Sequence, residues 1–436
     1  MPQLFTTLLV CLLSVTSTAA AGFAGWWSTN VEGIPITVHL TDTPEGLKGV
    51  LYSPTQTADS IIIDRISAKA DTLSLHSSAI KASFKGVRKN DLISGHFRQG
   101  GMRVQVSLSK SAEESAKMQR LQTPMPPLQY FTGEVRVPID STYLAGTLTL
   151  PVNGMPAGTV VFITGSGTQD RDETIAGHKP FAVIADMLSR AGWATLRCDD
   201  RGAAGSAAAK PLISYTDMAN DVLAQINFVN SQPQLAGKPV GLLGHSQGGN
   251  IAFVTAANSP EQVGFIVALA TPGVKGSEIL VRQNEMLIGP YLTPAISERL
   301  HALFSLIASD KPAADIRAEA ATLATGLIPP AQIDNTLNVM LSDAYREIVR
   351  HDPAAFMARV KCPVLAINGN NDMQVDASQN LPAIVAAIPG AVTKSYPGIN
   401  HLMQPCTAPT LNYAASNITV APEILKDIVE FLLTLQ

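Results

Sequence analysis

One stretch decides the fold of this chain: Gly244-His245-Ser246-Gln247-Gly248. Residues 239–243 before it begin with a proline and are then apolar, as expected of a buried strand. Residues 249–257 after it place apolar side chains at helical spacing. A serine held between glycines on such a strand-to-helix turn has an exposed hydroxyl, because the missing Cβ atoms let strand and helix pack closely. The pattern therefore predicts Ser246 as a nucleophile.

The composition is that of a globular protein with a substantial core. Of its 436 residues, 46% are hydrophobic and 15% are charged, and the length favours two or three domains. The formal net charge of −4 argues against a nucleic-acid partner, because no overall basic field collects phosphates.

The first 21 residues have the pattern of a secretory signal peptide. The apolar run from Leu8 to Leu13 is too short to span a bilayer, and Ala19-Ala20-Ala21 offers small residues for cleavage after Ala20 or Ala21. No Lys or Arg precedes the apolar run, which leaves a buried N-terminal helix as the alternative. We expect an exported protein, periplasmic or extracellular, with no membrane span after signal removal.

Signal removal leaves three cysteines, Cys198, Cys362 and Cys406, which permit one disulfide at most. Two of them border apolar strands, and we therefore favour buried free thiols.

Residues 22–110 are predicted to form a β-rich N-terminal domain. Short runs of alternating apolar residues are broken by turn signals such as Asn90-Asp91 and Gly100-Gly101, which is typical of an antiparallel meander. Nothing in this domain suggests chemistry. Residues 111–128 change to mixed charges and prolines, and we interpret them as a linker.

Residues 129–436 alternate strands with helices, which predicts an α/β fold with a mostly parallel sheet covered on both faces. A hairpin near 135–150 leads into strands at 160–164, 194–198, 240–243, 265–268, 364–367 and 392–396, with helices near 181–191, 215–230, 381–388 and 423–435.

The alternation is interrupted at about 275–358, where the pattern is helical throughout. Eighty residues are too many for a loop. We predict a helical cap over the carboxyl edge of the sheet, where ligands bind in such folds. Leu300, Leu303 and Phe304 on one helix face are expected to pack on the rim of the sheet and to leave an apolar pocket over Ser246.

The serine needs a base, and the base needs an acid that holds its tautomer. Of the histidines after Ser246, His401 follows the last strand, where its loop can reach the serine. Asp372 follows the strand at 364–367 and is the predicted acid, with Asp376 in the same loop as the alternative.

The oxyanion of an acyl-transfer reaction needs backbone N–H donors. The residue after the nucleophile, Gln247, supplies one donor. The loop Thr164-Gly165-Ser166-Gly167 supplies the second, with Ser166 favoured and Gly167 as the alternative. No Lys-Ser or Lys-Thr follows this loop, which argues against phosphate binding. The sequence predicts neither a metal nor a cofactor.

These motifs resemble those of the EstD-type carboxylesterases, exported bacterial α/β-hydrolases with an N-terminal β-rich domain. The similar stretches are 163–172, 199–202, 244–249, 362–369 and 398–401. The resemblance implies Ser246 as nucleophile, Asp372 as acid and His401 as base. Ala203-Ala204-Gly205 departs from the family's usual Gly-x-Gly turn. Asp170, Arg171, Asp199 and Arg201 are expected to form structural ion pairs beneath the site, with substrate binding as the alternative.

The leading hypothesis is a serine hydrolase that cleaves small carboxylic esters through an acyl-enzyme. The same triad also serves peptidases and acyl-amide hydrolases, and a catalytically silent binding protein could keep the fold. The sequence does not indicate the acyl chain, the alcohol, the oligomeric state or the task of the β-rich domain.

Overall fold

The structure, a computed structural model, describes residues 22–31, 34–53, 60–111, 120–152, 154–207 and 214–435. The predicted signal peptide lies outside these residues. The chain divides into two compact units after Gln119, which we call the β unit and the hydrolase unit. No helix within the described ranges combines the length and the apolar character needed to cross a bilayer.

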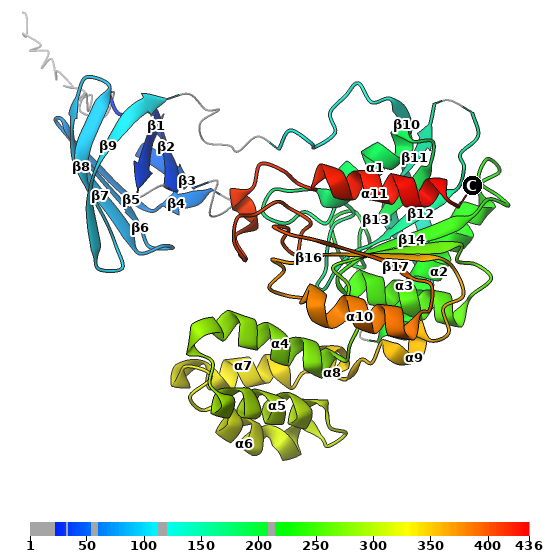
Figure 1. Cartoon of the computed structure of the whole chain (residues 1–436). Helices are drawn as coiled ribbons and strands as arrows, with labels where there is room; N and C mark the ends of the chain where they lie inside the picture. The colour runs from blue at the N-terminus through cyan, green and yellow to red at the C-terminus, as the bar shows by residue number, and fades with distance from the viewer. Residues whose placement is uncertain are drawn as a thin grey trace, which may run out of the picture. The chain divides into compact units, whose positions relative to one another are not determined.

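The β unit is one antiparallel sheet (Figure 1), with the strand order β4-β3-β2-β1-β9-β8-β7-β6-β5. Its edge strands β4 and β5 are separated along the chain by Asp64 alone, whose N–H donates to the carbonyl of His76 at 3.0 Å. The sheet therefore curls round until its two edges meet. The strands are β1 (Gly25–Val31), β2 (Ile34–Thr43), β3 (Gly46–Tyr52), β4 (Ile61–Ile63), β5 (Arg65–Lys69), β6 (Thr72–Ser77), β7 (Ala82–Lys89), β8 (Leu92–Gln99) and β9 (Met102–Ser111).

Alternating side chains fill the interior of the curled sheet. Trp27, Leu73 and Ile93 are fully buried there, because successive residues of a strand point to opposite faces. The apolar cavity that remains has a volume of about 40 Å³, which is far below the ~300 Å³ of ordinary ligand pockets. The interior is a packed core.

The hydrolase unit is built on a mixed sheet with the order β10-β11-β13-β12-β14-β15-β16-β17. The hairpin β10–β11 is antiparallel and joins β13 antiparallel, whereas β13, β12 and β14 to β17 run parallel. The strands are β10 (Tyr130–Ile139), β11 (Thr142–Pro151), β12 (Thr159–Ile163), β13 (Ala194–Cys198), β14 (Val240–His245), β15 (Phe265–Leu269), β16 (Val364–Gly369) and β17 (Val392–Tyr396). This is the α/β-hydrolase arrangement expected from the sequence, with an antiparallel edge.

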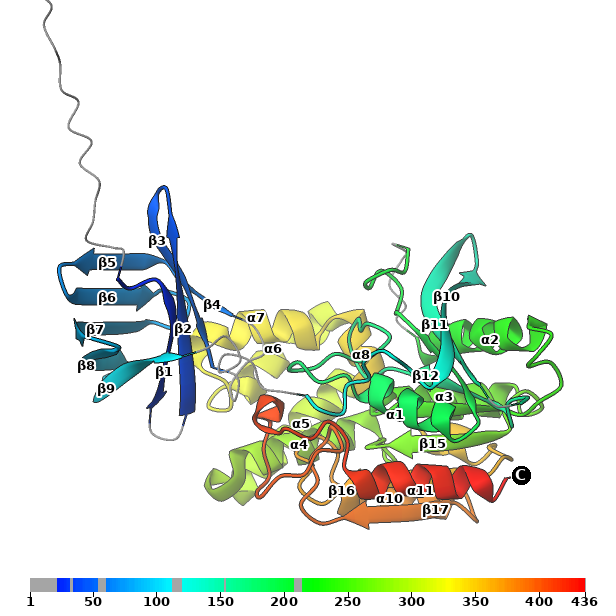
Figure 2. The ribbon, with the colours of Figure 1, turned by 90° about the horizontal axis from the view of Figure 1, so that it is seen from above.

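Helices cover both faces of this sheet (Figure 2). Helices α2 (Tyr215–Ser231), α3 (Gln247–Asn258) and α10 (Ala377–Ala387) pack on one face, and α1 (Pro180–Arg190) and α11 (Pro422–Leu433) on the other. The central strands β12, β14 and β15 are largely apolar and fully buried because helices cover both of their faces. All carboxyl ends of the parallel strands lie at one edge, where Ser246 follows β14.

The segment between β15 and β16 is helical, as predicted. It contains α4 (Gly276–Ile288), α5 (Pro294–Ala308), α6 (Ala313–Ala324), α7 (Ile333–Met340), α8 (Asp343–Arg350) and α9 (Ala354–Met357), with short 3-10 turns at Gly289–Tyr291 and Pro330–Gln332, and a third such turn lies at Tyr413–Ala415 before α11.

The expectation that Leu300, Leu303 and Phe304 pack on the rim of the sheet is wrong. These side chains are 2–3% exposed and belong to a core formed by the helices of the insert themselves. An amphipathic helix needs a partner for its apolar face, and here the neighbouring helices supply that partner.

Candidate active site

Ser246 lies on a strained turn between β14 and α3. Its backbone has φ 53° and ψ −120°, a conformation that costs a non-glycine residue roughly 1–3 kcal/mol. The turn is held by the Ser246 N–H, which donates to the Leu269 carbonyl at 2.8 Å, and by the Gly249 N–H, which donates to the Ser246 carbonyl at 3.1 Å. This geometry is the strand-to-helix elbow predicted from the motif.

The flanking glycines are required by close backbone contacts. A Cβ atom at Gly248 would overlap the carbonyl oxygen of Ile163, and one at Gly244 would overlap the carbonyl of Gly248. The turn therefore sits against the end of β12, directly beside the loop at 164–167.

Asp372 and His401 form a buried pair. Nδ1 of His401 donates to Oδ2 of Asp372 at 2.8 Å, and both residues are 4% exposed. The other carboxylate oxygen of Asp372 accepts the N–H groups of Gln374 at 2.7 Å and Val375 at 2.9 Å. Since its acceptors are occupied on both sides, Asp372 holds the imidazole of His401 in one orientation and leaves Nε2 for another partner.

Asp376, the alternative acid, is engaged elsewhere. Its carboxylate caps α10 by accepting the N–H of Ser378 at 2.9 Å and pairs with Nε of Arg282 on α4 at 2.7 Å. Burial alone would raise the pKa of Asp376, but Ser378 and Arg282 hold it below its usual range. This aspartate ties the insert to the sheet domain.

His245, the residue before the serine, carries a network that the sequence analysis missed. Its Nδ1 lies 2.9 Å from Oε1 of Glu173, and its Nε2 lies 2.9 Å from the carbonyl oxygen of His401. A carboxylate and a carbonyl both accept, so both ring nitrogens donate and His245 is an imidazolium cation. Burial lowers the pKa of His245, but the neighbouring Glu173 carboxylate outweighs it and raises the pKa above its usual value.

Glu173 extends this network to the predicted oxyanion loop. The same Oε1 atom accepts the N–H of Gly165 at 2.6 Å. Glu173 is 1% exposed and has a positive φ of 52°, so a strained backbone delivers a buried charge to this position. One carboxylate oxygen thus joins the loop after β12 to His245 at the Ser246 turn, and the other ring nitrogen of His245 extends the connection to the loop of His401.

The oxyanion donors predicted at Ser166 and Gln247 lie on these two segments. Gln247 is the first residue of α3, directly after Ser246. The N–H of Gly165 is already bonded to Glu173, so the free positions of the loop begin at Ser166 and Gly167, both of which are exposed. The assignment of the second donor to Ser166, with Gly167 as alternative, stays a prediction.

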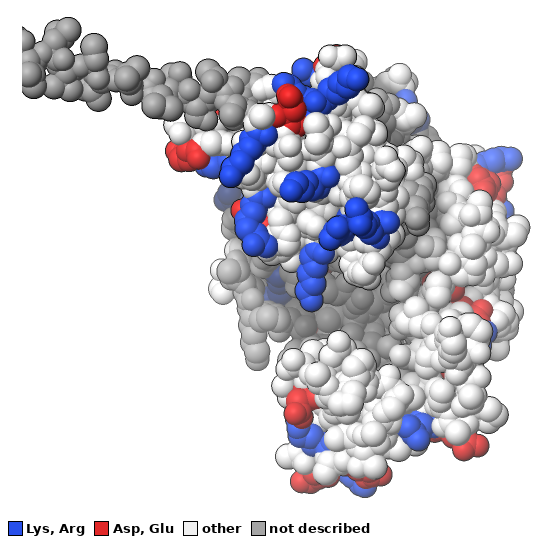
Figure 3. Space-filling model, turned by 90° about the vertical axis from the view of Figure 1, so that its left-hand side faces the viewer, with Lys and Arg blue, Asp and Glu red and all other residues white. Residues whose placement is uncertain are grey.

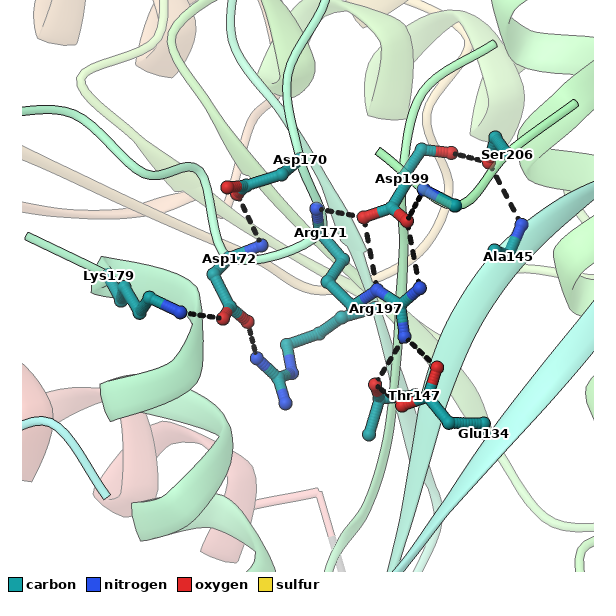
Figure 4. A network of polar contacts seen from close by, with 11 residues as sticks. Glu134, Ala145, Thr147, Asp170, Arg171, Asp172, Lys179, Arg197, Asp199 and Ser206 are labelled. Atoms are coloured by element: carbon teal, nitrogen blue, oxygen red, sulfur yellow. Dashed lines mark hydrogen bonds and ion pairs between the residues drawn. The ribbon is translucent and has the colours of Figure 1, made fainter. Parts of the chain in front are cut away.

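A polar network fixes residues 170–172, which follow the predicted oxyanion loop (Figure 4). Arg171 bonds to Asp199 at 2.8 Å and to Glu134 at 2.5 Å, which joins the loop to β13 and β10. Burial alone would raise the pKa of Asp199, but Arg171 and two backbone N–H groups hold it below its usual range. Arg197 pairs with Asp172 in the same network.

The expected ion pairs beneath the site are present in part. Arg171 pairs with Asp199, and Arg201 pairs with Asp221 at 2.5 Å. Asp170 instead accepts the N–H groups of Asp172 and Thr174, each at 3.0 Å. In the atypical turn after Arg201, Ala204 adopts the positive φ of 40° that a glycine would take more easily.

A pocket of about 340 Å³ adjoins the elbow and the oxyanion loop. Gly167 and Gln247 line one side, and Ala344 and Ile348 of the insert line another. Asp200 contributes a carboxylate that accepts from Thr164 Oγ1 at 2.9 Å and from the Gln169 N–H at 2.8 Å. Burial raises the pKa of Asp200 to about 6. The pocket wall is therefore mixed: apolar side chains such as Leu144, Phe162 and Ile251 lie beside the acids Asp199, Asp200 and Asp221 and beside Arg201.

The remaining candidate histidines lie away from this pair. His301 is exposed on α5. His351 is 9% exposed and stacks on Tyr215 with ring centroids 3.6 Å apart. Within the described ranges, no group of His, Cys, Asp and Glu side chains is arranged to hold a metal ion. Cys198, Cys362 and Cys406 are free thiols.

Residues 178–404, just over half of the chain, match the family model described as serine aminopeptidase, S33. The chain belongs to this hydrolase family. The matched range contains the elbow, Asp372 and His401, so the buried pair and the strained serine lie inside the family's core.

The chain is also similar to Esterase EstD of Thermotoga maritima, with 27% identity over 232 residues. The similarity covers 53% of this chain and half of the length of that relative. Among solved structures, Est1E from Butyrivibrio proteoclasticus is similar over 70% of this chain and 98% of its own, with 16% identity and a TM-score of 0.45. Dienelactone hydrolase from Anabaena variabilis is similar over 70% of this chain and 95% of its own, with 18% identity and a TM-score of 0.40.

Proposed function

We propose that this protein is a carboxylesterase that cleaves small esters through an acyl-enzyme on Ser246. The observation that carries the proposal is the buried bond between His401 and Asp372. The loop of His401 is connected to the Ser246 turn, because Nε2 of His245, the immediate neighbour of Ser246, lies 2.9 Å from the carbonyl oxygen of His401. Acyl transfer requires a general base that an acid orients and that reaches the serine hydroxyl, and these two bonds support that role for His401.

In the proposed mechanism, Nε2 of His401 takes the hydroxyl proton of Ser246 as the serine oxygen attacks the ester carbonyl. Asp372 keeps Nδ1 protonated, which leaves Nε2 free to accept, and it stabilises the imidazolium that forms. The N–H groups of Gln247 and Ser166 bind the developing oxyanion. His401 then donates its proton to the leaving alcohol, and a water molecule hydrolyses the acyl-enzyme by the same steps in reverse.

The relatives favour an ester as substrate. The curated relative is named an esterase, and this chain matches 50% of the length of that relative. The pocket of about 340 Å³, whose lining is part apolar and part polar, has the volume that suits a small acyl or alcohol group.

The description of the family model, serine aminopeptidase, favours a second candidate. In that case the same triad would cleave a bond next to a free amino group, and the Asp200 carboxylate in the pocket is a group that could bind an ammonium.

The two candidates are separated by assaying p-nitrophenyl esters of increasing acyl length beside aminoacyl p-nitroanilides. We expect turnover of the short esters and none of the anilides. The Ser246→Ala variant should lose ester turnover, by about a million-fold in comparable serine hydrolases, and still fold. Full activity of a clean Ser246→Ala preparation, or faster cleavage of the anilides, would overturn the proposal.

We also propose export, on the signal-like pattern of residues 1–21. The natively expressed protein should begin at Ala21 or Gly22 and occur outside the cytoplasm. N-terminal sequencing of fractionated cells measures both, and an intact Met1 in the cytoplasmic fraction would contradict export.

A further inference from the structure

Five neighbouring strands of the β unit, β5 to β9, carry an outward face that is basic and free of acids. No Asp or Glu occurs in these five strands. Burial alternates along them, so the side chains that are not in the core point outward. Six of these outward side chains are cations: Arg65, Lys69, Lys85, Lys89, Arg98 and Arg103.

The acids of the same region lie in the connections between strands. Asp64, Asp71 and Asp91 are placed before β5, between β5 and β6, and between β7 and β8. No ion pair joins any of them to the six outward cations within the described part of the chain, where the β unit's pair is Lys48–Glu45. The charge of this face is therefore available to a ligand.

The strand register arranges these side chains in two parallel rows. One row crosses the strands through Arg65, His76, Ser83, Arg98 and Arg103, and the next through Ser67, Ser74, Lys85, His96 and Gln105. Adjacent strands are about 4.8 Å apart, so each row spans roughly 19 Å. A linear molecule lying along the rows would meet cations and hydroxyls in turn.

Apart from Gln105, the residues of both rows line a groove of about 630 Å³ on this face. Arg65, Arg98 and Arg103 lie in its wall together with Lys85, and the serines of both rows supply hydroxyl groups. Figure 3 views this side of the β unit, where Lys and Arg gather and few acidic side chains are seen. The net charge of −4 for the whole chain conceals this local excess.

We propose that the outward face of β5–β9, which we call the basic face, binds an acidic polysaccharide of the uronate type. A guanidinium forms two parallel hydrogen bonds with a carboxylate, and a polyuronate presents carboxylates at regular intervals along an extended chain. Ser67, Ser74 and Ser83 between the cations match the hydroxyl groups of the sugars. The face would thus hold the enzyme on a polymer.

Other polyanions and partners fit this face less well. Its outward positions carry no Phe, Tyr or Trp, and aromatic rings are what single-stranded nucleic acids stack on. A peptide that adds to a sheet needs a free strand edge, but β6 to β9 are paired on both sides. A flat bilayer surface contacts side chains that protrude from a protein, whereas Arg65, Arg98 and Arg103 line a groove.

The test measures binding of the intact protein to polygalacturonate by isothermal titration calorimetry. We expect binding that weakens strongly when NaCl is raised to about 0.5 M. The double variant Arg98→Gln/Arg103→Gln should weaken it by at least about tenfold, because two charge-assisted pairs are lost. The matched control Lys48→Gln/Lys426→Gln removes two cations whose side chains are 67% and 73% exposed elsewhere, and it should change binding by less than about twofold.

Four further measurements decide between ligands. Neutral dextran should not bind, and dextran sulfate, single-stranded DNA and phosphatidylglycerol vesicles should bind more weakly than polygalacturonate. Tighter binding of any of these, equal loss in the control variant, or full binding by the arginine variant would overturn the proposal. Circular dichroism and thermal unfolding of the arginine variant should match those of the wild type, which shows that the β unit is folded and keeps this test independent of the proposed reaction.

Discussion

The carboxylate of Glu173 lies 2.9 Å from Nδ1 of His245, the residue that precedes Ser246, the proposed nucleophile. The two side chains are 1% and 5% exposed, so a charged pair is buried behind the elbow. Each partner also holds a loop of the site: Glu173 bonds to the N–H of Gly165, and His245 bonds to the carbonyl of His401. The pair therefore connects the predicted oxyanion loop with the loop of His401, the proposed base.

Removal of one member should be costly, because it leaves the other as an uncompensated buried charge. We expect Glu173→Gln to lower the free energy of unfolding by about 3–5 kcal/mol. Urea denaturation of the wild type, Glu173→Gln, His245→Gln and the double variant measures this as a double-mutant cycle. The double variant should be less destabilised than the sum of the single variants. A cost below about 1 kcal/mol for each single change would mean that the pair does not hold these loops.

The choice between Asp372 and Asp376 is open to a direct comparison. In Asp372→Asn, one of the two carboxylate oxygens becomes an NH₂ group. If the NH₂ group faces His401, two donors oppose each other at Nδ1. If it faces the other way, the N–H groups of Gln374 and Val375 lose their acceptor. The base then takes the wrong tautomer, and ester turnover should fall by about 10⁴-fold.

Asp376→Asn should leave turnover nearly intact and cost less than about 1 kcal/mol of stability, because asparagine can still cap α10 and the main loss is the charge in the pair with Arg282. Steady-state kinetics and thermal unfolding of both variants give the answer. If turnover collapses only in the Asp376 variant, Asp372 is not the acid.

The sequence was sufficient for the elbow and for the order of strands and helices, because both are local. Gly244 to Gly248 forms a turn whose glycines are required by contacts with Ile163 and with one another. The pairing of Asp372 with His401 followed from the rule that loops at the carboxyl edge of a parallel sheet meet.

The Glu173–His245 pair could not be predicted in the same way. The two residues are 72 positions apart in the sequence, and no local pattern links them. Their proximity depends on the adjacency of β12 and β14. The signal in the sequence was His245 itself: a histidine that follows a buried strand directly before Ser246 is expected to be buried and to need a hydrogen-bond partner.

Buried His351 should make the protein sensitive to acid. Burial lowers the pKa of His351 to about 4, whereas an unfolded histidine titrates near 6.5. Between these values the unfolded state binds the proton and the folded state does not, so stability falls as the pH drops from about 6.5 to 4, by up to about 3 kcal/mol.

His351→Phe should keep the stack on Tyr215 and remove this part of the acid sensitivity, since Nε2 of His351 has no hydrogen-bond partner among the described residues. Urea denaturation at a series of pH values compares it with the wild type, and His301→Phe controls for loss of one imidazole at an exposed position. An unchanged pH dependence in His351→Phe would assign the acid sensitivity to other groups.

The insert offers the last prediction, and the structure changes which residue tests it. Leu303 is 2% exposed inside the insert's own core, so Leu303→Ala should cost about 2–5 kcal/mol of stability without altering substrate preference.

Ile348 on α8, by contrast, lines the pocket beside Gly167 and Gln247. If the insert caps the site, Ile348→Ala enlarges the pocket and should move the optimum towards longer p-nitrophenyl esters, whereas Ile348→Phe should move it towards acetate, each by about tenfold in relative kcat/KM. Opposite shifts from one position require direct contact with substrate, since a general loss of packing would lower all rates together. An unchanged chain-length profile in both Ile348 variants, each shown to be folded by circular dichroism, would mean that the insert packs beside the site and does not set substrate size.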